Sequence, residues 1–273
     1  KELKKEVLLA KQFAMAQKVY GAESHINGFS GYGLECLIIY YKSFISMLKK
    51  LSQIDERIVL DPEKYYKNST DALFSLNESK LNSPIVLVDP TFKERNVLAA
   101  LSRETFRHFQ ESAREFLKKP SSVFFEIQES NKTKFKELAS SKKGEFINLQ
   151  LATDRQEGDI AGTKMKKFSL FLEKELHPFF DILSNEYVYP GYQEAKVYFV
   201  LKPKKKFVFL GPPIEMKAHA DAFKKQHKNS IVKAGHLQAE LNINFSAKQF
   251  LEDFKKKNKE KLIEMGITGF KVV

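Results

Sequence analysis

The sequence has few of the residues that build covalent or metal-centred sites. Its 273 residues include one cysteine, Cys36, so neither an internal disulfide nor a cysteine metal site can form. A lone thiol is typical of proteins of the reducing cytoplasm, where we expect this one to lie. Six histidines are scattered along the chain, without the close helical spacing and third partner of zinc sites. We therefore expect this chain itself to bind no metal.

Long hydrophobic runs are absent as well. No stretch of about 18 uncharged apolar residues occurs, and the longest apolar block covers only residues 37–41. A transmembrane helix is therefore excluded, and we expect no membrane partner. The first residue is Lys1 rather than methionine, and no basic-then-apolar leader follows it, so we expect the chain to begin inside a longer polypeptide.

Several catalytic motifs are missing too. The segment Gly28–Gly33 contains three glycines, but it lacks the Gly-Lys-Ser/Thr ending of a phosphate-binding loop and no predicted strand precedes it. A tight turn at a helix start is the favoured interpretation. No Gly-x-Ser-x-Gly nucleophile elbow occurs, and no Asp-x-Asp pair lies on an apolar strand, where two-metal phosphoryl transfer would need it. The sequence thus predicts no catalytic residue in this chain.

Positive charge, in contrast, is plentiful. The chain has 46 Lys and Arg against 34 Asp and Glu, a net charge of +12. Residues 1–119 hold 19 basic and 15 acidic residues (+4), and residues 120–273 hold 27 and 19 (+8). Such an excess favours a polyanionic partner, because each neutralised phosphate releases a condensed counterion. An AT-rich genome is the alternative, since it raises Lys and Phe regardless of function, and 24 Phe with no Trp fit it.

The first half of the chain is predicted to be helical. Apolar residues at helical spacing predict helices over residues 1–20, 32–52 and 96–117, and a short apolar run covers 85–88. The polar stretch 61–81 is expected to be a surface insertion. Pro120 stops the helix predicted over 96–117, and we place the domain boundary at this proline. The predicted domains are residues 1–119 and 120–273.

The second half mixes strands and helices. Alternating or short apolar runs predict strands, and longer amphipathic segments predict helices. The mixture predicts an α+β fold in which antiparallel sheets follow the helical N-terminal domain. The expected strands cover residues 123–127, 146–151, 195–201 and 237–243, and the expected helices cover 163–184, 218–227 and 247–265.

Three joined stretches carry a resemblance to a known family. They are Leu8–Phe13 with Val19–Glu23, Gly28–Tyr32 with Glu35–Phe44, and Val88–Pro90 with Glu94–Ser102. In order and character they resemble the part of archaeal (class I) CCA-adding tRNA nucleotidyltransferases that follows the catalytic head. A looser similarity continues through residues 158–160, 211–214 and 235–245.

The resemblance implies a division of labour. In this family a head with a Gly-Ser motif and metal-binding aspartates precedes a helical neck, and a body and tail then grip tRNA. Residues 1–119 would be the neck, a poly(A)-polymerase-like substrate-binding domain that completes the nucleotide pocket, and 120–273 would be the body and tail. The implied partners are the acceptor arm of tRNA, CTP, ATP and a catalytic head domain or subunit. Magnesium would be bound by that head and not by this chain, which departs from the family in lacking the head and in its longer insertion at 61–81.

The resemblance also implies three nucleotide-binding residues. Lys11 and Tyr20 match the family's nucleotide-contacting lysine and tyrosine, and Arg95 matches the arginine of its Glu-Arg-Asn-Val segment. Lysine would supply a point charge for the triphosphate, tyrosine a hydroxyl donor, and arginine a planar fork of donors for a cytosine or adenine edge. Without the resemblance, Lys11 and Arg95 would be interpreted as surface residues of helices.

Basic clusters of the second half are the predicted RNA-binding surface. Lysines at the ends of elements suit phosphate contacts on a duplex that is recognised by shape. The run 255–261 could equally be a solvated helix face. The candidate residues are Lys164, Lys166, Lys167, Lys204, Lys205, Lys206, Lys224 and Lys225.

Three functions remain open from the sequence. The first is the non-catalytic part of a CCA-adding enzyme, as a fragment or a split subunit. The second is a headless protein that only binds tRNA. The third is the C-terminal part of a poly(A)-polymerase-like nucleotidyltransferase, which the order of nucleotide incorporation would distinguish.

Overall fold

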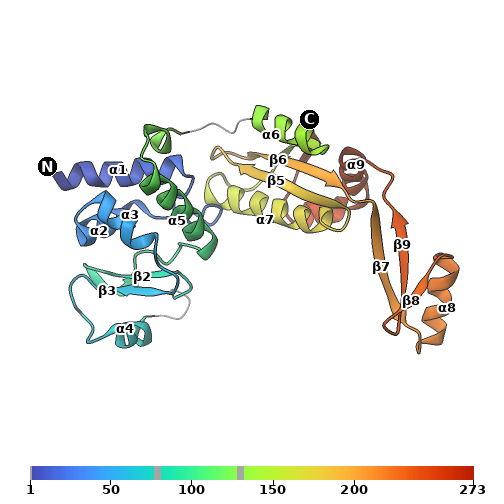
Figure 1. Ribbon diagram of the computed structural model, residues 1–273, viewed down its shortest axis with the longest axis horizontal. Helices are drawn as coiled ribbons and strands as arrows, with labels where there is room; N and C mark the ends of the chain where they lie inside the picture. Colours follow the sequence, from blue (N-terminus) through green and yellow to red (C-terminus); the bar gives the residue numbers. More distant parts are fainter. Residues whose placement is uncertain (1, 77–80, 128–131) are drawn as a thin grey trace. The chain divides into compact units, whose positions relative to one another are not determined.

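The computed structural model describes residues 2–76, 81–127 and 132–273, and it divides the chain into two compact units (Figure 1). The units are Lys1–Glu129 and Ser130–Val273. Each combines helices with sheets, so the α+β prediction is confirmed. The division falls after the predicted boundary at 119/120 because a 3-10 turn, Ser122–Phe125, packs its phenylalanines on the core of the first unit. The strand predicted over 123–127 is therefore wrong.

The core of the first unit is helical and rich in phenylalanine. The Phe13 ring meets Phe44, Phe109 and Phe116 edge to face, with ring centres 5.4 to 6.0 Å apart. Edge-to-face packing of this kind adds to the area that each ring buries. The helices that bring the rings together are α1 (Glu2–Ala16), α2 (Gly31–Tyr41), α3 (Phe44–Leu51) and α5 (Arg103–Lys118).

Two predicted helices of this unit differ from the observed ones. The helix expected over 32–52 is divided into α2 and α3, because Lys42 adopts a left-handed backbone (φ 68°) and Ser43 caps α3. The helix expected over 96–117 begins only at α5, where the Ser102 hydroxyl accepts the backbone N–H of Thr105 at 3.1 Å. Of the residues before Ser102 that were expected to be helical, Asn96 ends a strand and residues 97–100 form a turn.

A small sheet completes the first unit. Its order is β1-β2-β3, in which β1 and β2 are parallel and β2 and β3 are antiparallel. The predicted insertion contains a short helix, and its residues 77–80 lie outside the described residues. The sheet strands and that helix are β1 (Ile58–Leu60), β2 (Ile85–Asp89), β3 (Phe92–Asn96) and α4 (Ser69–Ser75).

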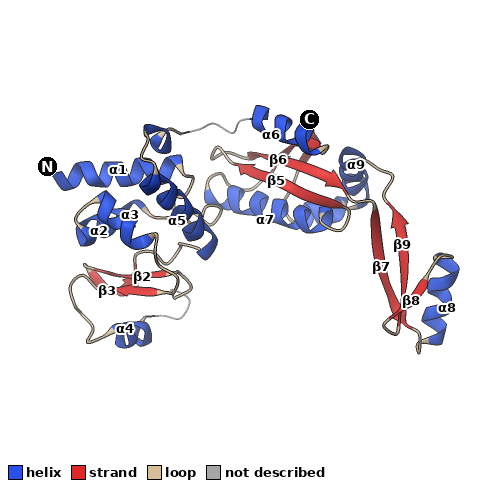
Figure 2. Ribbon diagram, viewed as in Figure 1, coloured by secondary structure: helices blue, strands red, loops and turns tan. Residues whose placement is uncertain are grey.

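The second unit is built on an antiparallel four-stranded sheet of order β10-β4-β6-β5. The chain follows a β-α-β-β-α-β path through it, the split βαβ arrangement. The helices α7 and α9 share one core with the sheet, whereas α6 covers the opposite face (Figure 2). The elements are α6 (Lys132–Lys142), β4 (Glu145–Ala152), α7 (Asp159–Leu176), β5 (Phe180–Val188), β6 (Glu194–Pro203), α9 (Ala247–Lys257) and β10 (Gly269–Val272).

Two expected helices of the second unit are shorter than predicted. The helix expected over 163–184 ends at Leu176, and β5 begins at Phe180 after a turn. The helix expected over 247–265 is divided into α9 and α10 (Lys259–Glu264).

A second, smaller sheet of this unit has the order β7-β9-β8, with α8 packed on it. Gly211 makes that packing possible, because a side-chain carbon there would lie 2.8 Å from the ring of Phe223 on α8. The elements are β7 (Lys206–Pro213), α8 (Lys217–Gln226), β8 (Ile231–Lys233) and β9 (His236–Asn242).

Candidate nucleotide site and RNA interface

The first turn of α2 is where two predicted nucleotide-binding residues meet. Lys11 lies on α1, and Tyr20 follows that helix in a short bridge to Phe29. A side-chain carbon at Gly31 would lie 2.8 Å from the Tyr20 hydroxyl and 3.7 Å from the Lys11 ammonium nitrogen. Both polar groups therefore approach the first residue of α2, and glycine leaves them room.

The turn that leads into α2 depends on glycine. The backbone N–H of Gly28 donates to the Gly21 carbonyl at 2.7 Å, and a side-chain carbon at Gly28 would lie 2.1 Å from the Val19 carbonyl oxygen. No other residue fits there. Ser30 then caps α2, because its hydroxyl accepts the N–H of Gly33 at 2.9 Å. The interpretation of this segment as a helix-start turn is confirmed.

Lys11 is oriented by a neighbour on α2. Its Nζ donates to Oε1 of Glu35 at 2.6 Å, and this hydrogen bond is the largest cause that raises the pKa of Lys11. The ammonium group therefore stays protonated. The positive end of the α2 dipole lies beside it, so this corner of the first unit favours an anionic ligand group.

Arg95 lies on β3, so the expectation that it stands at the start of a helix is wrong. Its Nε donates to Oδ2 of Asp89 at 2.5 Å, and its Nη2 pairs with the same oxygen. The guanidinium carbon lies 5.6 Å from the centre of the Tyr32 ring. The Arg95 side chain is 51% exposed, whereas that of Asp89 is fully buried. The guanidinium is thus anchored by a buried carboxylate and remains accessible to a ligand.

The carboxylate of Asp89 is surrounded by donors. Its Oδ1 accepts the Tyr32 hydroxyl at 3.0 Å and both the N–H and the hydroxyl of Thr91 at 2.8 Å. Burial alone would raise the pKa of Asp89, but the bonds from Thr91, Tyr32 and Arg95 outweigh it and lower the pKa to about 2. Asp89 is therefore a charged, fully buried anchor.

The three predicted nucleotide-binding residues consequently border one segment, Gly28–Gly33. Two of them approach its first helical residue, and the third stacks on the next. The sequence prediction did not include Tyr32 and Asp89. Their signals in the sequence are weak, an aromatic residue in a glycine turn and an Asp-Pro pair at the end of an apolar run.

The insertion predicted at 61–81 is attached to the same part of the unit. The Tyr65 hydroxyl donates to the Pro90 carbonyl at 2.6 Å, and the Tyr66 hydroxyl donates to the Lys93 carbonyl at 2.8 Å. Both carbonyls belong to the β2–β3 hairpin. The insertion is therefore bonded to the hairpin that carries Asp89 and Arg95.

The eight lysines predicted to bind RNA are not equivalent. Lys166 is partly buried and lies over a tyrosine ring. Lys204 donates to the His177 carbonyl at 2.5 Å, and Lys206 donates to Glu240 at 2.6 Å, so these two cations already have partners. The remaining five are exposed, namely Lys164, Lys167, Lys205, Lys224 and Lys225.

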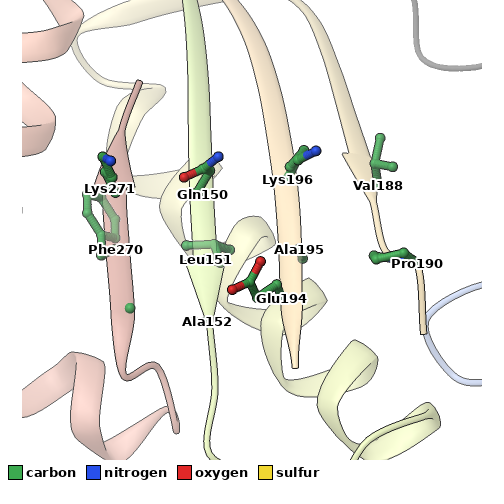
Figure 3. A pocket seen from close by; sticks show the side chains of 11 residues that line it. Gln150, Leu151, Ala152, Val188, Pro190, Glu194, Ala195, Lys196, Phe270 and Lys271 are labelled. Carbon is green, nitrogen blue, oxygen red and sulfur yellow. The ribbon is translucent and has the colours of Figure 1, made fainter. Parts of the chain in front are cut away.

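One half of the α6 face of the large sheet is open and was missed by the sequence analysis. Lys271, Gln150 and Lys196 stand in register on three neighbouring strands (Figure 3). They line a cavity of about 290 Å³, which also contains Glu194. The signal was the exposed-buried alternation of residues 194–197, which ends where α6 covers β6. Two ammonium groups that flank an amide can contact a phosphate backbone.

Metal and membrane chemistry can be tested on the described residues. Among them, no group of three or more His, Cys, Asp or Glu side chains could hold a metal ion. None of the helices in the described ranges is long and apolar enough to cross a membrane.

Comparison with known proteins places these features in context. Residues 5–126 match the family model of the tRNA nucleotidyltransferase second domain. The CCA-adding enzyme of Nanoarchaeum equitans is 29% identical over 250 residues, which are 87% of this chain and 58% of that enzyme. The CCA-adding enzyme of Methanosarcina acetivorans is 30% identical over 234 residues, which are 82% of this chain and 48% of that enzyme.

Identity is higher over a shorter match. The CCA-adding enzyme of Thermococcus kodakarensis is 39% identical over 122 residues, 44% of this chain and 27% of that enzyme. The chain spans about half the length of the relatives that match most of it.

Proposed function

We propose that this chain, which is similar to archaeal CCA-adding enzymes over most of its length, is the tRNA-binding and nucleotide-recognising part of a template-independent CCA-adding tRNA nucleotidyltransferase. It binds the acceptor arm of tRNA and contributes to a pocket for CTP and ATP. A catalytic head, as a domain or a subunit, supplies the chemistry. The observation that carries this proposal is the convergence of Lys11, Tyr20 and Arg95 on one helix start.

Each of these side chains has a distinct task in the proposed pocket. The Lys11 ammonium, oriented by Glu35, neutralises triphosphate oxygens together with the amino end of α2. The Tyr20 hydroxyl donates a hydrogen bond to the same anion. Arg95 presents planar N–H donors to the acceptors on the edge of cytosine or adenine. The chain therefore distinguishes nucleotides without activating them.

Magnesium is expected in the head. The described residues of this chain offer no cluster that fits the ion, so no step at a metal is assigned to them. Their work is to bind and orient the two substrates.

The second unit holds the RNA in this proposal. Its exposed lysines on α7, on α8 and between β6 and β7 contact phosphates, and the row of Lys196, Gln150 and Lys271 adds a further contact surface. Phosphate contacts of this kind set position and affinity without reading sequence. All tRNAs should accordingly be bound alike.

The decisive experiment tests the chain with and without a catalytic head. The purified chain is incubated with CTP, ATP, magnesium and tRNA that lacks its 3′ end, alone and with the segment of the Methanosarcina acetivorans CCA-adding enzyme that precedes its match to this chain. We expect no addition by the chain alone and ordered addition of C, C and A when the head is present. Addition by the chain alone would contradict the assignment of catalysis to the head.

Two other outcomes would select the alternatives. Tight tRNA binding without addition in the presence of the head would favour a headless tRNA-binding protein. Incorporation of A alone, repeated many times, would favour a poly(A)-polymerase-like enzyme.

A further inference from the structure

The side chain of Arg95 is held in one orientation more firmly than that of an exposed arginine usually is. A long, half-exposed side chain usually samples many rotamers, and holding it in one of them costs conformational entropy. Here two of the three guanidinium nitrogens bond to one buried oxygen of Asp89, and the guanidinium lies against the Tyr32 ring. The third nitrogen, Nη1, meets no acceptor among the described residues. The side chain is therefore oriented with part of its donor set unused.

Asp89 cannot contact a ligand itself. Its side chain is fully buried, and its two oxygens accept five bonds, three on Oδ1 and two on Oδ2. A carboxylate offers about four lone-pair sites, so none remains for a substrate. Its influence on a nucleotide must act through the arginine that it holds.

We infer that Asp89 is a positioning residue that sets the plane in which Arg95 meets the incoming base, and that Tyr32 supports this plane from the ring side. The inference rests on the proposed function, in which Arg95 recognises the nucleotide. A guanidinium with a fixed plane can distinguish donor and acceptor patterns on a base edge, whereas a freely rotating one would accept many patterns.

The insertion predicted at 61–81 also helps to hold Asp89 and Arg95 in place. Tyr65 and Tyr66 bond to two carbonyls of the β2–β3 hairpin, at Pro90 and at Lys93. Asp89 and Arg95 stand on the two strands of that hairpin. The two tyrosines therefore limit the relative motion of the carboxylate and the guanidinium.

The activity test uses Asp89→Asn in the chain supplemented with the catalytic head. The kcat/KM values for CTP, ATP, UTP and GTP are measured on tRNA that lacks its 3′ end. We expect the preference for C and A over U and G to fall by about 10- to 200-fold, the range for a lost recognition contact, with tRNA affinity unchanged. An equal loss for all four nucleotides would overturn the inference, because a purely structural role gives that result.

A mutant cycle tests whether Asp89 acts through Arg95. In an Arg95→Ala background, Asp89→Asn should cause no further loss of selectivity. Selectivity losses of the two single variants that multiply in the double variant would contradict the inference. Should Asp89→Asn fail to fold, the double variant Tyr65→Phe and Tyr66→Phe replaces it, with an expected selectivity loss of about 2- to 10-fold. Tyr192→Phe, an exposed tyrosine of the second unit, is the matched control and should change nothing.

A readout without activity separates this inference from the proposed function. In the chain alone, labelled with ¹⁵N-arginine, the Nε–H signal of Arg95 should exchange with solvent far more slowly than that of the exposed Arg107. Asp89→Asn should remove the difference, and Tyr192→Phe should preserve it. Equal exchange of the two arginines in the wild-type chain would overturn the inference. Slow exchange without CCA addition by the supplemented chain would instead reject the proposed function.

Discussion

The two units use positive charge in opposite ways. In the first unit the cations of the candidate nucleotide site are paired, Lys11 with Glu35 and Arg95 with the buried Asp89. In the second unit six of the eight predicted RNA-binding lysines are exposed to solvent, and of these Lys206 is paired with Glu240. A paired cation has a direction and acts at short range, whereas a solvated one attracts any anion over about a Debye length. Paired cations therefore suit discrimination between nucleotides, and solvated cations suit attraction of RNA.

The largest effect should come from salt, which screens only the second kind of charge. With about six phosphate contacts the log–log salt slope for tRNA binding should be about −5, an affinity loss of about 10³-fold between about 50 and 200 mM salt. Nucleotide selectivity of the supplemented chain should change less than about two-fold over that range, because the Asp89–Arg95 pair is partly buried. Filter binding and single-nucleotide incorporation measure the two quantities. A slope near zero would mean that the net charge of +12 reflects genome composition.

The next largest effect should come from replacing Arg95, which removes a paired cation of the first unit and leaves the exposed lysines of the second unit unchanged. In the supplemented chain Arg95→Lys should leave tRNA affinity and folding nearly unchanged but reduce incorporation by about 10- to 200-fold, because lysine lacks the planar fork. Selection of C and A over U and G should relax. Lys11→Ala is the control, since losing a phosphate contact should slow all nucleotides alike. Unchanged rate and selectivity in Arg95→Lys would make Arg95 a surface residue.

Acid should act on the first unit through Asp89. Its pKa in the folded protein, about 2, is below the ordinary value of 3.8, so its ionised form stabilises the fold above about pH 4 and this contribution is lost as the pH falls through 2. The full contribution should be about 2 kcal/mol. Urea unfolding between about pH 6 and 2.5 should show the difference between wild type and Asp89→Asn shrinking with acid. The exposed Asp154→Asn variant should show no such trend.

A smaller effect is expected on the open sheet face. Replacing both Lys196 and Lys271 by Gln should reduce the salt slope of tRNA binding by about two and leave nucleotide selectivity unchanged. Lys255→Gln with Lys257→Gln removes the same charge from α9 and is the matched control. Equal effects of the two double variants would mean that the sheet face has no special part in RNA binding.

The smallest effect separates neighbouring lysines. Lys205→Gln should reduce the salt slope by about one, because this exposed lysine is available to a phosphate. Lys206→Gln should change it less, since its ammonium is paired with Glu240 at 2.6 Å. The opposite order would show that the pair opens on RNA binding.

The sequence was most informative where local patterns decide the structure. The amphipathic helix of residues 1–20 and the strand of 146–151 recur as α1 and β4. The segment of Arg95 was mistaken for helix because the decisive contacts are distant in sequence. The Asn96 side chain accepts the N–H of Leu87 at 3.0 Å, and the N–H of Val97 donates to the Leu87 carbonyl at 2.9 Å. These bonds need β2 in place, so helical spacing alone could not reveal them.

The candidate site was even harder to predict from the sequence. Lys11, Tyr20 and Arg95 came from the resemblance and stay a prediction, because their residue types alone indicate ordinary surface positions. That Asp89 would be a fully buried anchor was beyond the sequence, since its five bonds require Tyr32 of α2 to meet Thr91 and Arg95 of the β2–β3 hairpin. The open sheet face required the position of α6, which no periodicity specifies.

The buried thiol of Cys36 is a chemical probe of local opening in the first unit. It is the one thiol of the sequence, it is 4% exposed, and burial raises its pKa, so the folded first unit presents almost no reactive thiolate. It lies on α2 one turn beyond Tyr32, whose ring supports Arg95. A thiol reagent therefore labels the chain only when this helix opens, and its rate of reaction reports how large the open fraction is.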